Sequence, residues 1–407
     1  MNVIFIEPFF PKNQREFVRA LHTVGARVIG IGEYPYDAFD DDLKKWLYHY
    51  EQVPSVVNED AVTRTVKWVQ ERVQVHRLEA TVEAHIMAAA RIREACRIPG
   101  TSVQTAFLCR DKPAMKEVLR AANIPTAASI GAENTEEAWA FARDNGYPLI
   151  VKPRDGAGAA GTYRCDNDQD LARAISESGL ERGRSVAIEE FIEGHEGFYD
   201  TITINGSVVH EFATHYYPNV LEAMRTRWIS PQFLTTNRID TADGYNEVKE
   251  MGRRVIEALG IETSATHMEW FYGPKGLKFA EIGCRPPGVR CWDLYAHGNE
   301  MDIYVEWAMA IVHGRSAQKA SRRYAAGIVA LRADRDGTID HYEGMEEIQT
   351  KFGDLIIDHH FPPPGSPAGT VEGGYMAGAW IRMKHPDYDE LRGILDTVGR
   401  TVKVRAR

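Results

Sequence analysis

A lysine that stands between a short apolar run and a glycine-rich loop is the part of this sequence best suited to binding a phosphate. Residues 149–151 are apolar, Lys152 follows them, and Gly156, Gly158 and Gly161 come shortly after. Because glycine has no side chain, the backbone amides of such a loop can approach a polyphosphate closely. The segment predicts a phosphate-binding loop introduced by Lys152; a plain flexible hairpin with a solvated lysine is the alternative.

The glycine spacing matches two other nucleotide-binding patterns, but the residues around it argue against both. Gly-x-Gly-x-x-Gly is typical of dinucleotide-binding proteins when a helix begins directly after the third glycine, whereas residues 162–165 predict a strand. A P-loop needs lysine and then serine or threonine after its last glycine, and Thr162 and Tyr163 stand there instead. We therefore expect a flexible flap over phosphates, between two antiparallel strands.

Two glutamates on a predicted β-hairpin could hold a metal ion. Residues 264–271 and 277–282 read as strands around a Gly-Pro-Lys-Gly turn, which places Glu269 and Glu281 nearly opposite each other. Facing carboxylates repel each other unless a cation lies between them, and all-oxygen ligands favour Mg²⁺ or Mn²⁺ completed by water and phosphates. The pair predicts a magnesium–nucleotide site; in the alternative, one glutamate faces solvent. We interpret His267 as a structural partner of Glu269 rather than as a ligand.

Arg285 follows Glu281 by four residues, in a turn rich in glycine and proline. A guanidinium fixed beside a metal–phosphate centre is suited to stabilising the charge that develops during phosphoryl or acyl transfer. A structural ion pair is the alternative for Arg285.

The elements that must position these residues divide the chain into three parts. Residues 1–110 predict a doubly wound parallel domain, because strands at 2–6 and 26–32 flank a helix at 14–23. Residues 111–320 would form the central domain, with a lid at about 125–190, and residues 321–407 a small β-rich accessory domain. In the central part we expect Thr135 to cap a helix over 135–144, and a hairpin to close at Asn205 and Gly206.

The segment 215–243 is polar and aromatic without a clear period. A long irregular segment in a compact enzyme is usually functional or mobile, and we expect one of these roles here.

Composition favours small-molecule chemistry in the cytoplasm. The chain has 407 residues, 44% of them hydrophobic, with a formal net charge of −10, so we expect no nucleic-acid or membrane partner. No apolar run reaches the roughly 18 residues of a membrane span, and the N-terminal residues lack the basic opening of a signal peptide. Five scattered cysteines without a paired motif predict buried free thiols rather than disulfides or zinc.

These motifs, in this order, resemble the ATP-grasp superfamily from residue 111 to about residue 312. Residues 281–288, Glu-Ile-Gly-Cys-Arg-Pro-Pro-Gly, are similar to the L-amino acid ligase branch of its carboxylate–amine ligases. The resemblance implies an α/β (α+β) ATP-grasp fold, in which an N-terminal parallel βαβ domain precedes the ATP-grasp domain with its glycine-flap lid, and a small C-terminal β-rich domain follows. One departure is Gly283, which stands where many members carry asparagine.

The resemblance also assigns roles to residues of this sequence that match the family's motifs. It implies Lys112, Lys152 and Gly158 at the ATP phosphates, Glu189, Phe191 and Ile192 around adenine, Glu196 on the ribose, Glu269 and Glu281 as metal ligands, and Arg285 on an acyl phosphate.

The activity implied by the resemblance is ATP-dependent ligation of a small carboxylic or amino acid to an amine through an acyl phosphate. Arg225, Arg227, Arg290 and the aromatic residues of the segment 215–243 are candidates for substrate recognition, since a planar guanidinium matches the carboxylate of an amino acid. We expect ATP, Mg²⁺ or Mn²⁺, and a homodimer. A small-molecule kinase and a non-catalytic ATP-binding module are the alternatives, and an NAD-dependent oxidoreductase is the weakest of all, because no helix is expected after Gly161.

Overall fold

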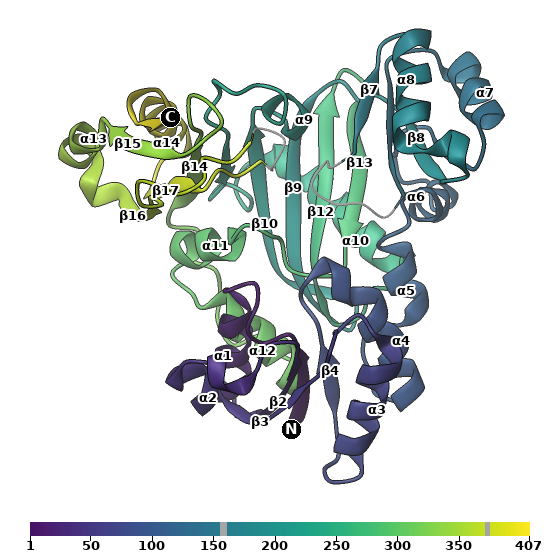
Figure 1. Cartoon of the computed structure of the whole chain (residues 1–407), viewed down its shortest axis with the longest axis vertical. Coiled ribbons are helices and arrows are strands. Elements are labelled where there is room, and N and C mark those ends of the chain that lie inside the picture. Colours follow the sequence, from purple (N-terminus) through teal and green to yellow (C-terminus); the bar gives the residue numbers. More distant parts are fainter. Residues whose placement is uncertain (155–160, 371–374) are drawn as a thin grey trace.

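Three lobes surround one large antiparallel sheet in the computed structural model (Figure 1), which describes residues 1–154, 161–370 and 375–407. The N-terminal lobe lies at the bottom of the view, a lobe with α7 and α8 at the upper right, and the C-terminal lobe at the upper left. The phosphate-loop residue predicted at Gly158 lies outside the described residues. No helix in the described ranges is long and apolar enough to cross a membrane.

The N-terminal lobe is a parallel four-stranded sheet in the order β3-β2-β1-β4, which confirms the parallel βαβ domain expected there. Apolar residues on one face pack with α3 and α4, and those on the other face with α1 and α12. Its elements are β1 (Asn2–Ile6), α1 (Gln14–Thr23), β2 (Arg27–Gly32), α2 (Asp41–Trp46), β3 (Leu47–Gln52), α3 (Glu59–Gln70), β4 (Arg77–Glu79) and α4 (Ile86–Cys96).

The lobe at the upper right of Figure 1 is an antiparallel sheet in the order β5-β8-β6-β7, with its own core of buried apolar residues. It contains β5 (Ser129–Ala132), α7 (Thr135–Asn145), β6 (Leu149–Pro153), β7 (Tyr163–Cys165), α8 (Asp168–Ser178) and β8 (Val186–Glu190). Strand β7 pairs antiparallel with β6, so the strand predicted after the glycines is confirmed and the dinucleotide pattern is excluded.

Of the two helix caps predicted near this lobe, the structure confirms one and corrects the other. The side chain of Asp111 accepts a hydrogen bond from the Ala114 amide at the start of α6 (Lys112–Ala121), as expected. The cap of α7 is Asn134 and not Thr135, because the Asn134 side chain accepts from the Glu137 amide while Thr135 is already helical.

The central sheet has eight antiparallel strands in the order β13-β12-β9-β10-β11-β14-β17-β16. Asn205 and Gly206 join β9 and β10 with φ angles of 47° and 79°, which confirms the predicted hairpin. The strands are β9 (His195–Ile204), β10 (Ser207–Tyr217), β11 (Gln232–Thr235), β12 (Ser264–Gly273), β13 (Gly276–Gly283), β14 (Ala325–Leu331), β16 (Ile356–His360) and β17 (Ala379–His385). The sheet is therefore shared by the segments before and after residue 320.

Helices cover both faces of this sheet. Along β9, Tyr199 packs in the cluster with α10, while Phe198 and Ile202 pack in the cluster with α11 and α12, as the alternation of side chains along a strand requires. The remaining elements are α5 (Val103–Leu108), α9 (Val220–Ala223), α10 (Asn246–Ala258), α11 (Cys291–Asn299), α12 (Ile303–His313), β15 (Ile339–Glu343), α13 (Met345–Phe352), α14 (Tyr388–Thr401) and β18 (Lys403–Ala406).

Two sequence expectations change at this level. The segment 215–243 is not uniformly irregular, since β10 extends to Tyr217 and the segment also holds α9 and β11. The prediction for the cysteines is confirmed: all five are free and buried.

Candidate active site

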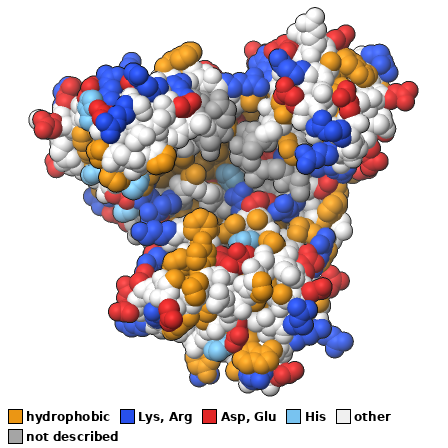
Figure 2. All heavy atoms as spheres, in the orientation of Figure 1, with side chains coloured by type: hydrophobic (Ala, Val, Ile, Leu, Met, Phe, Trp, Pro, Cys, Tyr) orange, Lys and Arg blue, Asp and Glu red, His pale blue; other side chains and the backbone are white. Residues whose placement is uncertain are grey.

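A cavity of about 950 Å³ lies between the central sheet and the strands β6 to β8. The surface is hollowed where the three lobes meet, and charges of both signs are interspersed around it (Figure 2). The cavity brings together most of the predicted site residues: Lys112, Lys152, Glu189, Phe191, Ile192, Glu196, Arg225, Glu269, Glu281 and Arg285.

Glu269 and Glu281 pair directly across β12 and β13, which confirms the predicted register. Lys112 Nζ lies 3.2 Å from Glu281 Oε2. Burial favours the protonated form of Glu281, but Lys112 and Lys152 lower its pKa and keep it charged. Within the described ranges, no cluster of three or more His, Cys, Asp or Glu residues could hold a metal. The donor set of two carboxylates fits a Mg²⁺ ion that takes its other ligands from water and phosphates.

His267 stands next to this pair and is held by a second carboxylate. Its Nδ1 is 2.7 Å from Asp200 Oδ1, and its Nε2 is 3.7 Å from Glu269 Oε1. Burial opposes protonation of the ring, yet Asp200 and Glu269 raise the pKa of His267 to about 9. The histidine therefore contributes a positive charge beside Glu269.

Lys152 belongs to a buried group of three charges. Glu189 Oε2 lies 2.9 Å from Lys152 Nζ, and Glu189 Oε1 lies 2.6 Å from Lys116 Nζ. Although burial raises the pKa of Glu189, the two lysines lower it to about 2. The Glu189 side chain thus bridges two lysines, while its predicted place beside adenine concerned the backbone.

Sequence reasoning missed Lys116. It is almost fully buried, and burial lowers its pKa to about 8 although Glu189 favours the charged form. The available signal was its position on α6 one turn after Lys112, because side chains four residues apart lie on the same face of a helix.

The residues predicted for adenine and ribose lie where β8 leaves the lid and β9 begins. Phe191 lines the cavity beneath the guanidinium of Arg164, whose Cζ is 4.3 Å from the ring centroid. Glu196 accepts a hydrogen bond of 2.6 Å from the Val220 amide. Burial, reinforced by the charge of Glu269, raises the pKa of Glu196 to about 8. The nucleotide roles of these residues stay predictions.

Arg285 lines the cavity and also forms the ion pair that was kept as its alternative. Its Nε lies 2.6 Å from Glu83 Oε2, and it donates to the carbonyl of Pro286. Arg110 lies 3.3 Å from the other carboxylate oxygen of Glu83. Glu83 comes from the N-terminal lobe, and no local pattern linked it to Arg285, 202 residues later.

Of the three candidate substrate arginines, only Arg225 lines the cavity. Arg227 instead pairs with Asp336. Arg290, the residue before α11, places its Nε 2.5 Å from Asp293 Oδ2 within the same turn. The guanidinium groups of Arg227 and Arg290 thus form ion pairs with other residues, and neither arginine lines the cavity.

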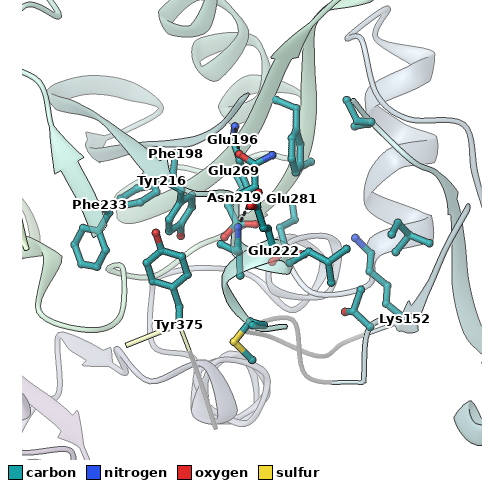
Figure 3. Close-up of a pocket in the computed structure, with 18 of the residues that line it drawn as sticks. Lys152, Glu196, Phe198, Tyr216, Asn219, Glu222, Phe233, Glu269, Glu281 and Tyr375 are labelled. Atoms are coloured by element: carbon teal, nitrogen blue, oxygen red, sulfur yellow. Dashed lines mark hydrogen bonds between the residues drawn. The ribbon is translucent and has the colours of Figure 1, made fainter. Parts of the chain in front are cut away.

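Four aromatic residues lie on one side of the carboxylates, with Lys152 on the other side (Figure 3). They are Phe198, Tyr216, Phe233 and Tyr375. Two of them, Tyr216 and Phe233, belong to the segment 215–243, whereas the sequence did not single out the other two. Phe198 could have been predicted at the site, because it lies two residues after Glu196 on the same strand and therefore on the same face.

A family profile matches one part of the chain that builds this site. Residues 111–198 match the profile described as "Carbamoyl-phosphate synthase L chain, ATP binding domain". This segment is therefore similar to the ATP-binding domain of that family. It carries both predicted phosphate lysines and the hinge between β8 and β9, whereas Glu269, Glu281 and Arg285 lie beyond it.

Two curated proteins are similar to this chain over part of its length. The uncharacterized protein y4rH of Sinorhizobium fredii is 25% identical over 265 residues, which cover 63% of this chain and 54% of that protein. The L-arginine-specific L-amino acid ligase of Bacillus subtilis is 28% identical over 215 residues, covering 51% of each chain. The chain thus spans about half the length of these curated relatives.

A solved structure extends the likeness to the whole chain. The L-amino acid ligase from Bacillus licheniformis superimposes with a TM-score of 0.76, covering 100% of this chain and 98% of that one at 16% identity. At that identity, the comparison shows a shared fold.

Proposed function

We propose that the chain is an ATP-dependent carboxylate–amine ligase, which activates a small carboxylic or amino acid as an acyl phosphate and couples it to an amine. The observation that carries the proposal is the convergence of Lys112, Lys152, Glu269, Glu281 and Arg285 on one cavity. A ligase needs cations for phosphates, carboxylates for a metal, and a guanidinium for the charge of the acyl phosphate. All three occur together.

In this proposal, Lys112 and Lys152 bind the phosphates of ATP, and residues 191–192 and Glu196 bind its adenosine. Glu269 and Glu281 hold Mg²⁺, or Mn²⁺ in its place. The ion supplies positive charge at the phosphate oxygens when it is bound.

The chain's own residues would position reactants and neutralise charge, as phosphoryl transfer mainly requires. The substrate carboxylate takes up the γ-phosphoryl group and ADP leaves; the amine then attacks the carbonyl carbon, and phosphate leaves as the amide forms and the nitrogen loses a proton. Arg285 is placed to stabilise the acyl phosphate. The lid strands β6 and β7 border the cavity and would keep water from that intermediate.

ADP release with different substrate combinations tests the proposal. Purified protein with Mg-ATP is given an acid alone, an amine alone, or both, and the products are identified by mass spectrometry. Ligation predicts that the full turnover rate needs both substrates and yields an amide plus phosphate. A stable phosphorylated acid formed without any amine would instead establish the kinase alternative, and ATP binding without turnover the non-catalytic one.

The proposal extends to Mg²⁺, a cytoplasmic location and a homodimer, which the resemblance to the ATP-grasp superfamily supports. Removing the metal with EDTA should stop ADP release, and added Mg²⁺ should restore it. Size-exclusion chromatography with light scattering should give twice the chain mass of 45.8 kDa.

A further inference from the structure

The aromatic residues in the cavity form a continuous wall. The ring centroids of Phe198 and Tyr216 are 5.0 Å apart, and those of Tyr216 and Tyr375 are also 5.0 Å apart. Phe233 lies 6.1 Å from Phe198 and 6.3 Å from Tyr375. These spacings are typical of packed aromatic pairs, so the four side chains form one apolar cluster, called here the aromatic wall. Tyr216 and Tyr375 are half-buried and face the cavity, and the buried Phe198 and Phe233 support them.

The aromatic wall begins next to the predicted metal carboxylates. Glu281 pairs with Glu269 across β13 and β12, and Glu269 pairs with Phe198 across β12 and β9. Tyr216 and Phe233 then pair across β10 and β11. The direct partner of Phe198 on β10 is Thr214, and Tyr216 lies two residues further along β10, in the diagonal position that aromatic side chains can still reach. The carboxylates therefore lead into the rings through Phe198. Figure 3 shows this order, with Glu269 between the rings and Lys152.

Most of the predicted nucleotide residues come from a different part of the cavity; the exception is Glu196, predicted for the ribose, which alternates with Phe198 along β9. Phe191 and Ile192 follow β8, which pairs with β6, the strand of Lys152. Adenine and phosphates would therefore lie along the lid, on the other side of Glu269 from the aromatic wall. The wall is left to a second molecule bound in the same cavity.

The wall offers packing rather than charge. The Tyr375 hydroxyl donates to the backbone carbonyl of Gln232 at 2.6 Å, which leaves its ring as the surface toward the cavity. The lining continues with apolar residues (Leu221, Met224, Pro287, Val289 and Met376) and with the polar Asn219, Glu222 and Arg225. A charged side chain seated against the four rings themselves would lose its hydration, and the rings offer it no ion pair.

We propose that the carboxylate substrate of this ligase is an amino acid or related acid with an apolar, ring-bearing side chain that packs against Phe198, Tyr216, Phe233 and Tyr375. The inference rests on the proposed function, because the activated carboxylate must lie at Glu269 and Glu281. Its side chain is then within reach of Phe198, the strand neighbour of Glu269. A phenyl and a hydroxyphenyl group are both expected to bind, since an apolar pocket rejects an added hydroxyl only weakly.

The test compares acids of different side chain with one amine that has no carboxylate, such as an amino acid amide, so that only the acid can be activated. The kcat/KM for L-phenylalanine should exceed those for L-aspartate and L-lysine by about tenfold or more. Tyr216→Ala should lower the value for phenylalanine by about tenfold while the KM for ATP changes by less than about twofold. Tyr48→Ala removes the same ring at an exposed position of the N-terminal lobe and should change neither.

Binding provides a readout that does not depend on turnover. Calorimetry of the protein with Mg²⁺ and a non-hydrolysable ATP analogue should detect L-phenylalanine and not L-aspartate, and Tyr216→Ala should abolish the signal. If circular dichroism shows that Tyr216→Ala does not fold, Tyr375→Leu replaces it in the binding test. Preferred binding of aspartate or lysine, or binding of phenylalanine unchanged in both variants, overturns the inference. Phenylalanine bound at the wall without any ADP release would instead refute the ligase function and leave the wall as a ring-binding site.

Discussion

Glu189 links one predicted phosphate lysine, Lys152, to a second buried lysine, Lys116. Its two oxygens contact Lys116 and Lys152 on opposite sides, so each lysine shares one buried negative charge. With Lys116 present, Glu189 does not have to be balanced by Lys152 alone. Lys116 is therefore expected to tune how much of the Lys152 charge is available to a phosphate.

Replacing Lys116 by methionine tests this dependence. Lys116→Met keeps the side-chain length but leaves Lys152 as the nearer partner of Glu189, so the KM for ATP should rise by about five- to tenfold. The stability loss should stay below the roughly 3 to 5 kcal/mol that breaking an isolated buried pair costs, because Lys152 remains. Urea unfolding and ADP-release kinetics measure the two effects.

The matched control for that change is Lys351→Met, whose exposed pair with Glu347 lies on α13. Its effect on stability should be under about 0.5 kcal/mol. An unchanged KM for ATP in Lys116→Met would show that Lys116 has no effect on ATP binding.

Glu281→Gln addresses the metal pair directly. The amide removes one of two facing charges without changing the shape of the side chain, so ADP release should be abolished while circular dichroism and Tm stay close to those of the parent. The exposed Glu347→Gln is the control. Activity close to the parent level in Glu281→Gln would refute the metal assignment.

At the scale of elements, strong alternation and turn chemistry could be read from the sequence, whereas buried or short elements could not. Side chains of the two faces alternate along β12 and β13 on either side of a glycine turn, and this pattern was enough to predict the register of the two strands. Helix α11 is buried at most positions, so it shows no amphipathic period, and β11 is four buried residues inside a long polar segment. The contacts of Lys116 and Glu83 depend on tertiary packing, which spacing along the chain does not encode.

The cap of α7 gives a test at this scale. The Asn134 side chain accepts from the Glu137 amide at 3.0 Å and donates to the Glu137 carboxylate at 2.8 Å. Asn134→Ala should destabilise the lid by about 1 kcal/mol, and Thr135→Ala by less. Amide hydrogen exchange in residues 135–145 measures the difference. Equal effects of the two changes would contradict the assignment of the cap to Asn134 alone.

At the scale of the whole molecule, the N-terminal lobe reaches the site through Glu83. This carboxylate contacts Arg285 at 2.6 Å and also Arg110, just before Lys112. It is thus a positioning residue, since it would act on substrate only through the guanidinium. The N-terminal lobe, which the sequence linked to no ligand, takes part in the site by this contact.

Glu83→Gln should lower kcat by about tenfold, because small displacements of a catalytic group are costly, while the KM for ATP changes by less than about twofold. A purely structural role would lower Tm without this split between kcat and KM. Glu94→Gln, on the exposed face of α4, is the control. A rise in the KM for ATP at constant kcat would contradict the positioning role.

The shared central sheet also bears on how the chain reaches its native state. Strand β11 pairs with β14, from Gln232↔Val329 to Thr235↔Ala326, so β11 gains its second neighbour only after almost a hundred further residues have been synthesised. Until then β11 is an open edge, and unpaired edges promote aggregation. A chain ended at residue 320, the limit proposed for the central domain, should therefore be insoluble or oligomeric by light scattering, and adding residues 321–407 as a separate polypeptide during refolding should restore solubility. A soluble, monomeric 1–320 fragment would show instead that the strands before β14 fold without the C-terminal ones.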